Sequence, residues 1–208
     1  MKIYDVTRPI FNEMVVFPGD PTVTHTWVSS TKTGGFVNMS KIDFGMHTGT
    51  HVDAPLHFLA DGADLDQVDL AHFIGPARVV DIGREAKEIT RADLEPFSPR
   101  PGERLLIKTD NSFRDPDAGF DRDYVPITKD ACDYLAECGV YTVGVDFQTV
   151  GKGMEVAACH HALLGAGMCI IEGLRLADVP AGEYLLSALP LRIRGAEGCP
   201  VRAVLVSE

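Results

Sequence analysis

His47-Thr48-Gly49-Thr50-His51-Val52-Asp53-Ala54-Pro55-Leu56-His57 contains three of the seven histidines of the chain and one aspartate. Without a cation, three imidazoles and a carboxylate at this spacing would repel or desolvate one another. Core packing therefore explains the stretch poorly. Imidazole and carboxylate are ligands that suit Zn²⁺, Mn²⁺ or Fe²⁺. The stretch predicts a metal site.

The backbone of this stretch is expected to be extended or looped. A helix with His47 and His51 one turn apart is disfavoured, because the Thr-Gly-Thr between them forms helices poorly and Pro55 follows soon after. On an extended backbone His51 and Asp53 point to the same side. Glycine between the first two histidines lets the chain turn His47 back toward that side.

A second part of the site is expected near Cys159-His160-His161 and at Glu172. Glu172 interrupts an apolar segment, and a buried carboxylate needs a partner such as a metal. The alternative is a strand end where Glu172 meets solvent or an arginine. Of two adjacent histidines only one easily faces a given point. Cys159 could ligate zinc, but a thiol packed in the core beside a helix is favoured.

Composition excludes several classes of function. The 208 residues are 45% hydrophobic and 24% charged, with a formal net charge of -11. Such a surface repels nucleic-acid phosphates and anionic membranes. No apolar run is long enough to span a bilayer, and no targeting segment is evident at the N-terminus. The five cysteines form no CxxC pair, so reduced thiols in a cytoplasmic protein are expected.

Strand candidates outnumber helix candidates. Strands are predicted at 36–46, leading directly into the histidine run, at 184–193 with a kink at Pro190, and at 77–82, 104–108, 140–146, 168–172 and 201–206. Helices are predicted at 129–138, with Thr128 as N-cap and Gly139 as stop, and at about 154–164, with helical turns at 66–72 and 90–95. Strands mixed with few helices indicate an α/β or α+β domain with a mixed, curled sheet.

With these motifs the chain resembles a known family, the cyclase-like metal hydrolases typified by bacterial kynurenine formamidase. Residues 47–57 fit the family's HxGTHxDxPxH signature. Further matches are His160-His161-Ala162-Leu163-Leu164-Gly165 and Ile171-Glu172-Gly173-Leu174. The opening 4–10 and the ending 189–203 are also similar, so the resemblance covers essentially the whole chain.

The resemblance implies one β/β/α domain over residues 1–208, with a barrel-like mixed sheet, outer helices and a homodimeric assembly. It also implies two divalent metal ions per subunit, zinc in most members and manganese in some. His47 and His51 would bind the first ion and His160 the second, while Asp53 and Glu172 would bridge both. His57 would be the general acid and base.

The substrate implied by the resemblance is N-formylkynurenine, an intermediate of tryptophan catabolism, hydrolysed to kynurenine and formate by a metal-activated water. Phe17 stands where formamidases have a tryptophan that contacts the substrate, and residues 144–150 also depart from the family pattern. Phe17 keeps a ring for stacking but lacks the indole N–H. As an alternative it is a packing residue before a Pro-Gly turn.

The sequence admits two other functions and excludes two enzyme classes. A sibling enzyme could open another cyclic amide or a lactone, as isatin hydrolases do. A non-enzymatic metal-binding protein is less favoured, because every expected ligand and His57 are present. Serine hydrolases and P-loop enzymes are excluded, because the chain has no G-x-S-x-G elbow and Gly151-Lys152 is followed by Gly153.

Overall fold

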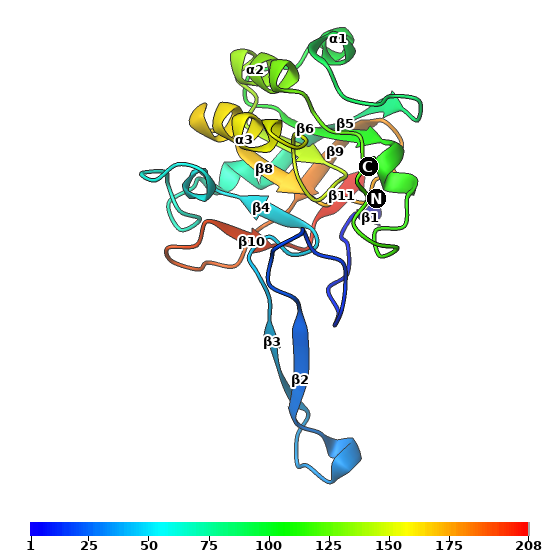
Figure 1. Ribbon diagram of the computed structural model, residues 1–208, viewed down its shortest axis with the longest axis vertical. Helices are drawn as coiled ribbons and strands as arrows, with labels where there is room; N and C mark the ends of the chain where they lie inside the picture. Colours follow the sequence, from blue (N-terminus) through cyan, green and yellow to red (C-terminus); the bar gives the residue numbers. More distant parts are fainter. Residues whose placement is uncertain (208) are drawn as a thin grey trace.

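The computed structural model describes residues 1–207 and consists of a curled mixed sheet, helices along one of its faces and a hairpin that projects away from it (Figure 1). The order of the nine strands is β1-β11-β9-β5-β6-β7-β8-β4-β10. The strands of this sheet are β1 (Lys2–Asp5), β4 (His51–Asp53), β5 (Ile74–Gly83), β6 (Arg104–Thr109), β7 (Thr142–Val145), β8 (Cys169–Glu172), β9 (Gly182–Ser187), β10 (Gly198–Pro200) and β11 (Val204–Ser207).

The centre of the sheet is parallel and its flanks are antiparallel. β5, β6, β7 and β8 run parallel, and the remaining pairs are antiparallel. The helices are α1 (Arg91–Leu94), α2 (Lys129–Glu137) and α3 (Glu155–Gly165). Short 3-10 turns lie at Thr31–Thr33, Pro55–His57, Leu70–His72, Glu95–Phe97 and Asp110–Phe113. No helix within residues 1–207 has the length and apolar character needed to cross a membrane.

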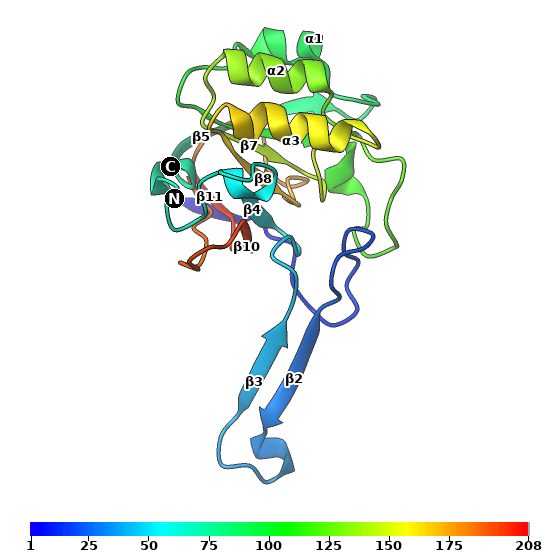
Figure 2. The same cartoon turned by 60° about the vertical axis from the view of Figure 1, so that its left-hand side comes forward.

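Successive side chains of the central strands point to opposite faces of the sheet, so a hydrophobic core forms on each face. Leu105 and Ile107 of β6 pack with the apolar faces of α2 and α3, which cover one face of the sheet (Figure 2). Leu106, the residue between them, belongs to the core inside the curl of the sheet. All six residues of β6 are buried, as expected for a strand covered on both faces.

Most of the predicted elements are confirmed. Strands form within or around 77–82, 104–108, 140–146 and 168–172. Helix α2 begins after Thr128, whose side chain accepts a hydrogen bond from the N–H of Ala131, and Gly139 adopts a φ of 70° just beyond it. The helix expected at 154–164 is α3, and a helical turn follows Thr90. The mixed, curled sheet with few helices is the fold class predicted from the sequence.

Three strand predictions need correction. The strand expected at 36–46 forms only at β3 (Met39–Asp43), so it does not lead directly into the histidine run; irregular backbone and a turn at residues 46–47 follow it. The strand expected at 184–193 ends at Ser187, before Pro190, and that expected at 201–206 begins at Val204. β1, β2 (Thr24–Ser29) and β10 were not predicted, because strands this short or this exposed have no clear apolar alternation.

The projecting hairpin consists of β2 and β3, which form a two-stranded sheet of their own (Figures 1 and 2). Its side chains are unusually apolar for an exposed segment. Trp27 is 61% exposed and Phe36, at the tip, is 99% exposed. Met39 and Ile42 are about half exposed. This apolar surface extends away from the body of the molecule.

Candidate metal centre

Strand pairing brings the second histidine of the run opposite the distant glutamate. In the antiparallel pair of β4 and β8, His51 lies directly across from Glu172. His51 and Asp53 are two residues apart on β4, so both point to the face that Glu172 shares. The extended backbone predicted for this stretch is confirmed, and all three side chains are buried.

The turn before β4 depends on glycine at two positions. Gly49 has a φ of 65°, the left-handed conformation that glycine adopts without strain. Gly173, just after β8, packs against it so closely that a Cβ there would lie 2.3 Å from the Gly49 carbonyl oxygen. Absence of a side chain at Gly173 therefore allows the end of β8 to approach the histidine run.

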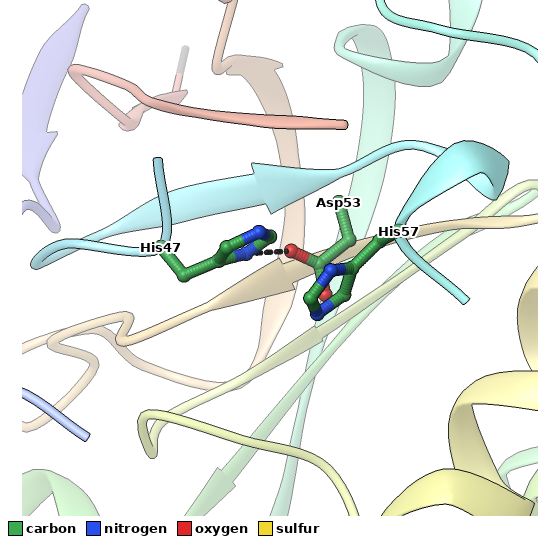
Figure 3. A group of neighbouring side chains, drawn as sticks. All are labelled: His47, Asp53 and His57. Carbon is green, nitrogen blue, oxygen red and sulfur yellow. Dashed lines mark hydrogen bonds and ion pairs between the residues drawn. The ribbon is translucent and has the colours of Figure 1, made fainter. Parts of the chain in front are cut away.

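His47 returns toward Asp53, as the glycine turn predicts. Its Nδ1 lies 2.8 Å from Asp53 Oδ1 (Figure 3). The space for its ring comes from Gly198 of β10, which pairs with Asp53 on the other edge of β4. A Cβ on Gly198 would lie 2.6 Å from His47 Cε1. The approach of β10 thus fixes the position of the ring.

The two carboxylates each turn one oxygen toward β4 and the other toward α3. Asp53 Oδ1 is 3.5 Å from His51 Nε2, and Asp53 Oδ2 is 3.6 Å from His160 Nε2. Glu172 Oε2 is 3.3 Å from His51 Nε2, and Glu172 Oε1 is 3.4 Å from His160 Nε2. The four side chains form a closed ring with a carboxylate at each junction between histidines.

Backbone carbonyls orient both histidines of this ring. His51 Nδ1 lies 3.2 Å from the Gly49 carbonyl oxygen, and His160 Nδ1 lies 2.7 Å from that of Val156, one turn earlier on α3. Donation from Nδ1 to these carbonyls directs Nε2 toward the carboxylates, the orientation in which a histidine ligates a metal through Nε2 once that nitrogen has lost its proton. The neighbouring His161 is exposed, and Cys159 is a buried thiol 3.5 Å from the Ile127 carbonyl oxygen.

The residues present fit a divalent cation. Among residues 1–207, the buried polar atoms without a hydrogen-bond partner include His47 Nε2, His51 Nε2 and Asp53 Oδ2. Two groupings have metal-ligand spacing, namely His47, Asp53 and His57, and His51, Asp53 and Glu172. Asp53 belongs to both. Imidazole and carboxylate donors suit Zn²⁺, Mn²⁺ and Fe²⁺.

The electrostatics of the cluster show paired charges. Burial alone would lower the pKa of His160, but its contacts with Asp53 and Glu172 raise it to about 10. Burial opposes ionisation of Asp53, yet His160 and His47 hold the pKa of its carboxyl well below the usual value. Two carboxylates this deeply buried remain ionised only because positive charge surrounds them.

His57 lies at the edge of the cluster, in the 3-10 turn Pro55–His57. Its ring stacks on that of His47 with centroids 3.8 Å apart (Figure 3). Burial is the largest cause that lowers the pKa of His57, to about 4. The imidazole is therefore neutral at physiological pH, as a proton acceptor or a ligand must be.

A pocket of about 180 Å³ opens onto the cluster. Phe17 lies in its wall and meets Phe120 edge-to-face at 5.3 Å. Phe58 stacks on His160 at 4.2 Å. Asp20 also lines the pocket, and burial is the main cause that raises its pKa. The remaining lining residues are His47, His57, Gln148, Thr149, Val156, His160 and Glu172.

The structure thus brings every residue expected at the site into one place. Sequence reasoning missed Asp20, Phe58 and Gln148 as pocket residues. Asp20 directly follows a Pro-Gly turn after Phe17, which is a usable signal. Phe58 directly follows the histidine run, but no sequence signal marks it as a pocket residue. Gln148 lies in a segment without helix or strand.

Relatives are similar to this chain over nearly its whole length. Residues 4–152 match the model of the Cyclase family, described as "Putative cyclase". A kynurenine formamidase of Salinibacter ruber is 39% identical over 208 residues, which are 99% of this chain and 97% of the relative. A kynurenine formamidase of Bacillus mycoides is 36% identical over 204 residues, 97% of this chain and 95% of the relative.

Solved structures agree with this assignment. A "predicted metal-dependent hydrolase" from Bacillus stearothermophilus superimposes with a TM-score of 0.86 at 36% identity, covering 98% of this chain and 97% of that one. An isatin hydrolase bound to thioisatinate shares the fold, with a TM-score of 0.87 at 22% identity over 100% of this chain and 93% of that one. The chain therefore belongs to the cyclase family and is an enzyme, a metal-dependent hydrolase.

Proposed function

We propose that the enzyme is an amidohydrolase that cleaves N-formylkynurenine to kynurenine and formate. The observation that supports this most directly is the ring of His51, Asp53, His160 and Glu172, in which each carboxylate has one oxygen toward each histidine. Relatives that share 34–39% of their residues with this chain have the name kynurenine formamidase. With this substrate the enzyme would act in tryptophan catabolism.

His47 and His51 would hold one divalent ion and His160 a second, with Asp53 and Glu172 shared between them. The unpaired buried nitrogens and oxygen of this set support that assignment. Zinc is the proposed metal and manganese the alternative, since histidine and carboxylate accept both. Bound divalent metal would supply a water of lowered pKa and polarise the substrate carbonyl.

His57 is proposed as the general acid and base. Its ring lines the pocket beside the cluster, and the lowered pKa leaves it free to accept a proton from water on a ring nitrogen. The same nitrogen then donates the proton to the aniline nitrogen of the leaving kynurenine. The spacing to His47 and Asp53 also permits ligation, so metal content of a His57 variant separates the two roles.

Phe17 is proposed to contact the aromatic ring of the substrate. It lies in the pocket wall, with its ring held edge-to-face by Phe120. Phe58 and Val156 add apolar surface on the side of α3. The half-buried Asp20 is the polar group of this wall whose pKa is raised by burial, so it offers a hydrogen bond to a polar substituent.

The alternative is a sibling reaction, ring opening of a cyclic amide as in isatin hydrolysis. Phe17 in place of the usual tryptophan favours this alternative, because the smaller ring reshapes the pocket wall. Both substrates require the same cluster, so the metal chemistry does not distinguish them.

The deciding experiment compares hydrolysis of N-formylkynurenine, isatin and simple esters by protein of known metal content. We expect N-formylkynurenine to have the highest kcat/KM and chelation to abolish its turnover. Preference for isatin would select the alternative. Absence of turnover on the whole panel by metal-loaded protein would contradict both substrate assignments.

We further propose a homodimer in the cytoplasm. The exposed apolar side chains of the hairpin β2–β3 need a covering surface, and a second copy of this chain is the proposed occupant. A two-stranded hairpin is only marginally stable in water by itself. All five cysteines are free, which fits a reducing compartment. Sedimentation velocity that finds only monomer would contradict the dimer.

A further inference from the structure

A second cavity lies close to the active-site pocket and has no part in the proposed chemistry. It encloses about 30 Å³. On the scale where one water needs about 10–15 Å³, it admits two waters or one small planar anion. Gln148 lines both the cavity and the active-site pocket, and Gly173 of the cavity directly follows Glu172 of the metal cluster. The two spaces therefore lie back to back.

Arg8 in the wall of this cavity has unused hydrogen-bond donors. The side chain is only 2% exposed. Its Nη2 donates to the Pro116 carbonyl oxygen at 3.1 Å and to Asp117 Oδ1. Its Nε and Nη1, also buried, have no partner among residues 1–207. Buried guanidinium N–H groups without acceptors are rare in proteins and indicate a missing ligand or water.

A second guanidinium, that of Arg175, lines the same cavity. It donates to the backbone carbonyls of Asn111, Ser112 and Arg114, and within the described residues it has no carboxylate partner. Burial lowers the pKa of Arg175; the carboxylate of Asp146 opposes this effect, and the positive charge of Arg8 adds to it. Arg114 also lines the cavity, but its guanidinium is paired with Asp110 and Asp121. Arg175 thus differs from Arg8 and Arg114 in having no carboxylate in direct contact within the described residues.

The carboxylates around the cavity have other hydrogen-bond partners and do not accept from Nε or Nη1 of Arg8. Asp146 is buried, but five hydrogen bonds from Thr109, Asn111 and Ser112 already occupy its oxygens. Asp121 pairs with Arg114. The exposed Asp115 accepts the backbone N–H of Asp117 in a turn. Within residues 1–207, no carboxylate therefore accepts a hydrogen bond from Nε or Nη1 of Arg8.

We propose that this cavity binds a small carboxylate, of the size of formate, between the free donors of Arg8 and the guanidinium of Arg175. Arg8 Nε and Nη1 lie on different edges of the guanidinium, so one oxygen of the carboxylate would accept an N–H from Arg8 while its other oxygen faces the guanidinium of Arg175. The identification of the anion with formate released at the active site rests on the proposed formamidase function. The existence of the site does not.

The direct test is titration of metal-loaded protein with carbon-13-labelled formate, followed by NMR line broadening. Formate also coordinates metals, so the titration is repeated after chelation. We expect a saturable component that persists after chelation and that weakens about tenfold in Arg8→Lys, because the ammonium can still reach Asp117 but cannot replace Nε and Nη1. Arg175→Lys is expected to weaken the same component.

Arg192→Gln is the matched control. This arginine is 85% exposed, pairs with Asp66 and does not line the cavity. Thermal unfolding verifies that each variant is folded. Equal formate binding by the wild type, Arg8→Lys and Arg175→Lys would overturn the proposal and leave a cavity that contains only water. Loss of all binding on chelation would also overturn it.

Kinetics distinguish the source of the carboxylate. If the site receives released formate, Arg8→Lys reduces product inhibition by formate and leaves KM unchanged. If it receives the carboxylate of the substrate, Arg8→Lys raises KM for N-formylkynurenine but not for formanilide, which has no carboxylate. Chelation-resistant, Arg8-dependent formate binding by a protein that does not hydrolyse N-formylkynurenine would refute the proposed function alone. Hydrolysis without such binding would refute the carboxylate site alone.

Discussion

The metal cluster and the hairpin β2–β3 are neighbours in the sequence but opposites in their surroundings. Asp53 is 0% exposed, and each of its oxygens faces a histidine. Phe36, seventeen residues earlier by number, is 99% exposed. The polar side chain is enclosed and the apolar one is in solvent, the reverse of the usual preference. Such an inversion supports the proposals that a cation completes the cluster and that a second copy of the chain covers the hairpin.

The largest effect is expected from His160→Ala. Loss of this ligand leaves Asp53 Oδ2 and Glu172 Oε1 without their histidine, so the second metal should be lost and turnover should fall to background. Metal content and kcat measure both effects. His161→Ala is the matched control, because the adjacent ring is exposed. Equal metal loss in the two variants would contradict the assignment of His160.

His57→Ala should lower kcat by about 10²–10⁴-fold while metal content stays unchanged, because positioned proton transfer contributes about this much. Elemental analysis measures the metal content, and steady-state kinetics measure kcat. A His57 variant that loses metal would instead assign this residue to the ligand set. Normal turnover would remove it from the mechanism.

Gly198→Ala should destabilise the fold by about 1–3 kcal/mol, because the added methyl group overpacks against His47. Metal affinity should fall as well, since His47 must move. Urea unfolding and metal titration measure the two effects. Gly165→Ala at the end of α3 is the control, because a Cβ there meets no atom within 4 Å. Equal stability of the two variants would show that β10 does not fix the His47 ring.

Phe36→Ser tests the other region and should have the smallest effect on the enzyme. If a second copy covers the hairpin, the substitution weakens the dimer by about 10-fold or more, because burial of a Phe side chain contributes about 1.5–3 kcal/mol. Sedimentation equilibrium measures the change. Metal content and the unfolding of the separated monomer should remain as in the wild type. An unchanged dimer would place the interface elsewhere.

The part of the cluster within residues 47–57 could be predicted from the sequence because these residues are neighbours in the chain. Glycine and proline restrict residues 47–57 to an extended path, and alternation then places His51 and Asp53 on one side. Thr128 likewise predicts the start of α2 from the residue itself. These predictions required no knowledge of distant segments.

Elements that depend on distant partners could not be predicted in this way. β10 has only Gly-Cys-Pro and becomes a strand because it pairs with β4. Apolar residues continue beyond Asp43, yet β3 ends there, since the ladder with β2 ends at that residue. The cavity at Arg8 is assembled from segments near residues 8, 111–121, 146–148 and 173–175. No periodicity in any one of them reveals the others.

The position of β10 also has a consequence for biosynthesis. β4 is bounded on one side by β8 and on the other by β10, whose Gly198 leaves space for the His47 ring. The ribosome synthesises His47 about 150 residues before Gly198. At a synthesis rate of roughly 5–20 residues per second, this separation is a delay of about 10–30 seconds. For most of that interval the nascent chain has residues 47–57 but neither β8 nor β10, and β10 is the last of the two strands to be synthesised. Metal capture with native geometry therefore follows completion of the chain, and a truncated product that ends before β10 is made without a formed metal centre.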